Sequence, residues 1–148
     1  MKWMAIILTI VMLSGCGIID EFNKTVDYGN ETKDYITTMV GYQDDLSTYL
    51  NKESLTEEDF ENLKSMMDEI EGEVQSYSEV EPPGFAEGIH GEIEQQNDQI
   101  LEAIDEANRQ IDSGEFDQSA FENLEIVQSL QELKSYRDQV EDIMNNNE

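Results

Sequence analysis

The sequence of 148 residues is strongly acidic, with 35 Asp and Glu against 8 Lys and Arg and a formal net charge of −27 at pH 7. Nucleic acid is excluded as a partner, because phosphates are neutralised by clusters of Lys and Arg. The same charge excludes a domain that lies flat on an anionic lipid surface. The length fits a single domain with its own hydrophobic core.

The N-terminal residues have the features of a signal peptide that ends in a lipidation motif. Lys2 precedes the apolar run Trp3–Leu13, which is shorter than the roughly 20 residues of a membrane-spanning helix. The tetrapeptide Leu13-Ser14-Gly15-Cys16 fits the bacterial lipobox. We therefore predict a signal peptide over residues 1–15, cleavage between Gly15 and Cys16, and a diacylglycerol on the Cys16 thiol, with or without an N-acyl chain. The alternative is an ordinary secretory leader with an incidental cysteine.

The predicted mature chain is an acidic helical domain over residues 16–145, followed by a disordered tail over residues 146–148. Its only thiol is Cys16, so lipidation would exclude disulfides, cysteine metal sites and cysteine nucleophiles. A diacylated terminus satisfies the two-chain condition for stable anchoring. We predict a location at the cell membrane, on its extracytoplasmic face, with the lipid as the only contact with the bilayer.

Apolar residues recur every three or four positions along the chain, which is typical of amphipathic helices. The first predicted helix covers residues 19–50, and its apolar stripe thins between Gly29 and Lys33, where we expect a kink or local irregularity. Ser54 or Thr56 is the predicted N-cap of a second helix that carries apolar residues from 60 to 77. Pro82-Pro83-Gly84 is expected to end it.

A third helix is predicted over residues 85–112, with Ser113-Gly114 as its stop. A fourth begins at the capping box formed by Ser119 and Glu122 and carries apolar residues from 121 to 144. Four amphipathic helices with short connections predict an all-α, antiparallel four-helix bundle. The alternative is a three-helix bundle with a loosely attached N-terminal helix.

Three stretches resemble the small uncharacterised lipoproteins, a domain of unknown function, of Bacillus-type Gram-positive bacteria. They are "CGIIDEFNKTVDYGNETKDYI", "EPPGFAEGIHGEI" and "IDSGEFDQSAFENLEIVQSL". The chain departs from the family pattern in its heavier acidity and in Gly91. The resemblance implies an all-α domain and a lipid anchor on the outer face of the cytoplasmic membrane, and it implies no activity.

No cluster of residues predicts a metal or catalytic centre. Glu87 and His90 have the spacing of half a di-iron carboxylate motif, but the sequence has no second histidine. We expect His90 to cap the Pro-Pro turn through backbone hydrogen bonds or to lie on the surface. Carboxylate runs such as Glu57-Glu58-Asp59 and Asp68-Glu69-Glu71 are interpreted as solvated faces, with weak, diffuse Ca²⁺ or Mg²⁺ binding as the alternative.

Four tyrosines follow one another at seven-residue intervals in the first predicted helix, at positions Tyr28, Tyr35, Tyr42 and Tyr49. A period of seven drifts only slightly around a helix, so the four rings share one side. One interpretation is a seam packed against neighbouring helices with the hydroxyls reaching solvent. The other is an exposed interaction face, since tyrosine is enriched in interfaces.

These observations predict a lipid-anchored, non-enzymatic protein of the cell envelope that acts through contacts with a protein or a wall polymer. No cofactor is expected beyond the covalent lipid on Cys16. The partners expected are the membrane, through the anchor only, and an envelope protein, while nothing in the sequence defines an oligomeric state. The alternative function is a cation- or salt-responsive acidic module that binds Ca²⁺ or Mg²⁺ weakly.

Overall fold

The computed structural model describes residues 16–116 and 125–146, with side chains described from residue 24 and, in the last helix, over residues 126–145. Within these ranges the chain forms four α-helices and one short 3₁₀ helix. The helices are α1 (Cys16–Leu50), α2 (Glu57–Tyr77), α3 (Glu87–Ser113) and α5 (Glu125–Asn146), and the 3₁₀ helix η2 is Gly84–Ala86.

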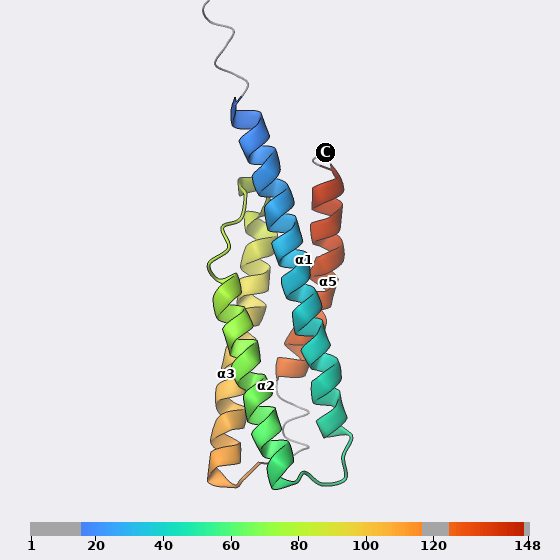
Figure 1. Ribbon diagram of the computed structural model, residues 1–148, viewed down its shortest axis with the longest axis vertical. Helices are drawn as coiled ribbons and strands as arrows, with labels where there is room; N and C mark the ends of the chain where they lie inside the picture. Colours follow the sequence, from blue (N-terminus) through green and yellow to red (C-terminus); the bar gives the residue numbers. More distant parts are fainter. Residues whose placement is uncertain (1–15, 117–124, 147–148) are drawn as a thin grey trace, which may run out of the picture.

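The helices run alternately up and down and form an antiparallel bundle (Figure 1). Helix α1 packs against α2 and α5, and α3 packs against the same two helices, so α1 and α3 lie diagonally opposite. The predicted all-α four-helix bundle is therefore confirmed. The three-helix alternative is wrong, because α1 packs along two neighbours and supplies Ile36, Met39 and Leu46 to the core with no exposed surface.

The core runs along the bundle axis and draws aliphatic side chains from all four helices. It contains, with 1% exposure or less, Ile36, Met39, Leu46, Leu63, Met67, Ile70, Ile93, Ile100, Ile104, Ile126, Leu130, Leu133 and Val140. Burial of each such side chain contributes about 1.5–3 kcal/mol. With no disulfide predicted for the mature chain, this packing holds the helices together.

Helix α1 is continuous through the segment where the apolar stripe thins. No break in the helical structure occurs between Gly29 and Lys33. Two features replace the missing aliphatic residues there: Thr32 is fully buried, and Gly29 lets Met144 of α5 approach the α1 backbone. A short polar side chain and a glycine thus maintain the helix contacts without an apolar residue.

The start of α2 and the end of α3 are capped by residues that the sequence analysis proposed for these positions. Thr56 is the N-cap of α2 and forms a capping box with Asp59, in which each side chain binds the other residue's backbone N–H. At the same end of the bundle, α3 ends at Ser113 and is capped by Gly114, which has a φ of 70° (Figure 1). The N–H of Gly114 donates to Ile111 and that of Glu115 to Gln110, as in a Schellman motif.

Helix α2 ends at Tyr77, earlier than the Pro82-Pro83 pair alone requires. Residues 78–83 continue along the bundle without helical structure until the chain turns into η2 and α3 (Figure 1). The predicted third helix thus starts slightly later, at Glu87. The capping box of Ser119 and Glu122 lies outside the described residues, as do residues 147 and 148.

Candidate functional site

The structure separates the four tyrosines of α1 into two pairs. Tyr28 and Tyr35 are 4% and 6% exposed and belong to the core, whereas Tyr42 and Tyr49 are partly buried at its edge. The interpretation as an exposed interaction face is therefore wrong for Tyr28 and Tyr35. The expectation that their hydroxyls reach solvent is also wrong, because both hydroxyls point into the bundle and form hydrogen bonds there.

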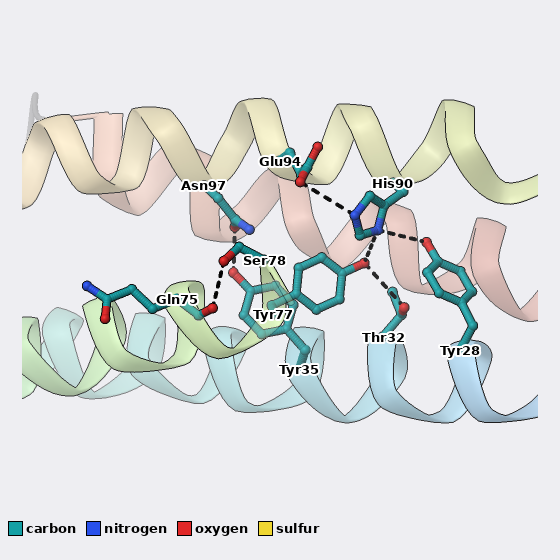
Figure 2. Close-up of polar contacts among 9 residues, drawn as sticks. All are labelled: Tyr28, Thr32, Tyr35, Gln75, Tyr77, Ser78, His90, Glu94 and Asn97. Carbon is teal, nitrogen blue, oxygen red and sulfur yellow. Dashed lines mark hydrogen bonds and ion pairs between the residues drawn. The ribbon is translucent and has the colours of Figure 1, made fainter. Parts of the chain in front are cut away.

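Tyr35 and Tyr77 form the centre of a polar and aromatic cluster between α1, α2 and α3 (Figure 2). Their rings stack with centroids 4.2 Å apart and an angle of 13° between the planes. The Tyr35 hydroxyl donates across the bundle to Asn97 Oδ1 at 2.5 Å, and the Tyr77 hydroxyl lies 3.2 Å from Thr32 Oγ1. We call Tyr28, Thr32, Tyr35, Tyr77, His90 and Asn97 the buried polar cluster.

His90 is 6% exposed and lies inside the buried polar cluster. Its Nδ1 is 3.2 Å from the hydroxyl of Tyr77 and 3.4 Å from that of Tyr28, while Nε2 faces Glu94 Oε1 at 3.5 Å (Figure 2). This arrangement fits the tautomer in which Nε2 carries the hydrogen and Nδ1 accepts from a tyrosine. The prediction that His90 caps the Pro-Pro turn or lies on the surface is wrong, because two tyrosine hydroxyls provide its partners.

The tyrosine hydroxyls of the cluster are held in their neutral form. Burial is the main cause that raises the pKa of Tyr28, of Tyr35 and of Tyr77 above the usual value of 10.0. A neutral hydroxyl that already donates to Asn97 or to a neighbour in the cluster is not available as a base. The chemistry that these groups carry out is therefore mutual hydrogen bonding within the fold.

An open groove of about 280 Å³ lies between α1 and α2, on the outer side of the stacked rings. Helix α1 lines it with Glu31, Asp34, Tyr35 and Thr38. Helix α2 and the segment after it line it with Glu73, Ser76, Tyr77 and Val80. We call this the α1–α2 groove. Its floor is aromatic and its rim is acidic, so it is suited to a ligand with an apolar stem and a positive charge.

A second, smaller hollow of about 130 Å³ lies between α3 and α5. Gln96, Gln99, Gln128, Ser129 and Glu132 line it, and the Ser129 hydroxyl donates to Gln99 Oε1 at 3.1 Å. The lining is polar and the volume fits only a few water molecules. The α1–α2 groove is thus the better candidate for a ligand.

The carboxylates of the two acidic runs in α2 differ in their hydrogen-bond partners and in their burial. Among the described residues no group of three or more His, Cys, Asp or Glu side chains has the geometry to hold a metal ion. Asp59 is buried in the capping box and accepts from Lys52 Nζ at 2.5 Å. Glu69 accepts from the Tyr42 hydroxyl at 3.4 Å, and it is exposed, as are Glu57, Glu58 and Asp68.

Sequence reasoning missed most of the residues that build the cluster and the groove. Thr32 and Asn97 were not identified, although each follows a cluster residue at helical spacing: Thr32 is four after Tyr28, and Asn97 is seven after His90. Asp34 and Glu73 carry no signal of their own among 35 acidic residues. Cys16 begins α1, but its side chain is outside the described part, so its lipidation stays a prediction.

The fold and this site define a class of protein, an acidic all-α bundle whose polar core residues bind one another. The chain belongs to a family of unknown function, DUF6376, whose model matches residues 28–143. It is similar to the uncharacterised lipoprotein YybP of Bacillus subtilis (strain 168), with 24% identity over 144 residues that cover 93% of this chain and 97% of the relative. No solved structure gives a significant match. None of the helices in the described ranges combines the length and apolar character needed to cross a membrane.

Proposed function

We propose that the protein is a lipoprotein of the cell envelope, anchored to the extracytoplasmic face of the membrane by a diacylglycerol on Cys16. The observation that carries the proposal is the tetrapeptide Leu13-Ser14-Gly15-Cys16 at the end of a short apolar run. The relative in Bacillus subtilis, which is described as a lipoprotein, supports it over nearly the full length of both chains. Cleavage between Gly15 and Cys16 would place the lipid directly at the start of α1.

The test is the intact mass of the protein isolated from native membranes. The expected product lacks residues 1–15 and is heavier than the bare chain by two or three acyl chains with their glycerol. The Cys16→Ser variant should keep its leader or leave the membrane fraction. A native product that retains residues 1–15, or whose cysteine is free, contradicts the proposal.

We further propose that the helical domain is non-enzymatic and acts by binding another component of the envelope, a protein or a wall polymer. The buried polar cluster supports this, because the hydroxyls of Tyr35 and Tyr77 face inward and bind Asn97, Thr32 and His90. The groups that would otherwise resemble an active site are therefore used to hold three helices together.

Proximity labelling from the lipidated protein on intact cells tests the binding role. The matched control is the same label on an unrelated lipid-anchored helical domain of similar size. A set of proteins enriched only by the native chain supports the proposal. Labelling identical to that of the control contradicts a specific binding role.

A further inference from the structure

The α1–α2 groove has three carboxylates on its lining, and none of the ion pairs found among the described residues includes them. Glu31 and Asp34 lie on α1 and Glu73 lies across the groove on α2. In the described part of the chain, the Lys and Arg side chains that form ion pairs do so with other carboxylates, those of Asp59, Glu106, Asp112, Asp138 and Glu141. Three like charges around one hollow repel one another, and a bound cation would relieve that repulsion.

Two of the hydroxyls that line the groove already use their hydrogens in other hydrogen bonds. The Ser76 hydroxyl donates to the Gly72 carbonyl at 2.9 Å, which leaves its oxygen lone pairs for a ligand. The Tyr35 hydroxyl donates to Asn97, on the inner side of the helices. A ligand that fits this lining therefore carries several hydrogen-bond donors and a positive charge.

The floor of the groove adds an apolar component to this lining. Tyr35 and Tyr77, whose rings stack, are 6% and 3% exposed, and the partly buried Val80 belongs to the same lining. A lysine side chain matches both parts, because its four methylenes lie along apolar surface while its ammonium reaches carboxylates. Carboxylates on two helices suit the three donors of an ammonium better than the single planar fork of a guanidinium.

We propose that the α1–α2 groove binds a lysine side chain from a basic peptide segment of a partner protein. The proposal rests on the binding role given above and names the partner's chemistry. Glu73 is among the causes that raise the pKa of Tyr35, so its negative field reaches the floor of the groove. The net charge of −27 attracts basic segments over longer distances, and the groove then selects the contact.

The test uses fluorescent hexalysine as the probe and the native, membrane-extracted protein in a nonionic detergent, followed by fluorescence anisotropy. The groove variant Glu31→Gln/Asp34→Asn/Glu73→Gln removes three charges and should weaken binding at least ten-fold. The control variant Asp98→Asn/Glu102→Gln/Asp105→Asn removes three exposed charges from α3 and should weaken it less than two-fold. Because both variants change the net charge equally, equal losses would mean diffuse attraction and would overturn the proposal.

A second variant places the cation in the groove permanently. Thr38 lies in the groove lining and is exposed, so Thr38→Lys should fold normally and compete with the probe, with at least a ten-fold loss of affinity. Unchanged affinity would overturn the proposal, as would displacement of hexalysine by an equal concentration of spermidine, which would indicate a site for any free polyamine. Proximity labelling tests the binding role separately, so a groove that does not select hexalysine is distinguishable from a protein that has no specific partner.

Discussion

At Tyr35, one hydroxyl group connects α1 to α3 across the middle of the bundle. It donates to Asn97 Oδ1, and Asn97 is 5% exposed. Tyr35→Phe leaves that oxygen buried without its donor, which should lower the free energy of unfolding by about 1–3 kcal/mol. Urea denaturation measures the change.

The control for this substitution is Tyr42→Phe, one heptad further along the same helix. Its hydroxyl donates to Glu69 at 3.4 Å in an exposed environment, so its loss should change the stability by less than about 0.5 kcal/mol. If the two variants lose the same stability, the cross-bundle hydrogen bond has no special role.

Asp59 makes the start of α2 sensitive to acid. The hydrogen bond from Lys52, followed by those from the backbone and side chain of Thr56, lowers the pKa of Asp59 from 3.8 to about 2. A lowered pKa in the folded state stabilises the fold above the unfolded pKa, and this contribution is lost as the pH falls through the folded value. Stability should therefore decline between pH 4 and pH 2, and Asp59→Asn should reduce that slope in urea melts.

The matched control for the acid dependence is Glu61→Gln, an exposed position in the first half of the same helix. This variant should retain the wild-type slope between pH 4 and pH 2. An unchanged slope in the Asp59→Asn variant would mean that other carboxylates dominate the acid response. Thr56→Ala removes the cap itself and should cost about 1 kcal/mol at neutral pH.

Two helices, α1 and α5, approach closely where α1 has a glycine. A Cβ at Gly29 would lie 2.6 Å from Met144 Cγ and 2.7 Å from Met144 Cε, and it would also meet the sulfur. Gly29→Ala should therefore force the Met144 side chain to move, which should offset most of the up to about 1 kcal/mol that Ala otherwise gains over Gly in a helix. In a Met144→Ala background the clash is absent, so the same change should become stabilising.

Gly41 is the matched control in the same helix, because nothing lies within 4 Å of a Cβ built there. Gly41→Ala should stabilise the protein by up to about 1 kcal/mol in thermal or urea melts. A Gly29→Ala variant as stable as Gly41→Ala would show that α5 moves away at no cost. Wild type, Gly29→Ala, Met144→Ala and the double variant form a double-mutant cycle, and Gly41→Ala is its propensity control.

The helices and their caps could be predicted from residues close together in the sequence. The buried polar cluster could not, because its members come from three helices. The capping box and the left-handed Gly114 depend on residues within one turn, so the sequence predicts the stop at Gly114 and narrows the N-cap to Ser54 or Thr56, of which the structure uses Thr56. His90 depends on Tyr28 and Tyr77, which are 62 and 13 residues away, and its sequence neighbours pointed to a turn instead. The same limit applies to the apolar stripe of α1, which thins between Gly29 and Lys33. The space at Gly29 is filled by Met144 of α5, a contact that the sequence of α1 alone does not indicate.

At the scale of the whole molecule, charge opposes compaction. The protein has 35 acidic and 8 basic residues, and most carboxylates have no opposite charge to pair with. Self-repulsion of this kind lowers the stability of the compact state. The aliphatic core along the bundle axis must offset it, because exposed ion pairs such as Lys64–Asp112 contribute only about 0–1 kcal/mol each.

Salt should therefore stabilise the protein. Raising NaCl from 0.1 to 1 M shortens the screening length from about 10 to about 3 Å, which removes much of the repulsion between neighbouring helices. We expect the melting temperature in scanning calorimetry to rise smoothly, and a gain of about 1 kcal/mol would correspond to roughly 3–6 °C for a domain of this size. A melting temperature that stays constant or falls would contradict the repulsion argument.

Calcium distinguishes this screening from the alternative function, a cation-responsive module. A specific Ca²⁺ site would produce saturable heat in titration calorimetry, with a fixed stoichiometry, and a stabilisation that exceeds that of NaCl at equal ionic strength. Screening alone would produce featureless heats and a gain in stability that continues to grow with the Ca²⁺ concentration.

The groove variant tests the repulsion locally. Because the carboxylates of the groove lie on two helices, the variant that neutralises Glu31, Asp34 and Glu73 should melt at a higher temperature than wild type at low salt and respond less to NaCl. The α3 control variant should show the smaller shift, since its three charges lie outside the groove and do not face a carboxylate across it.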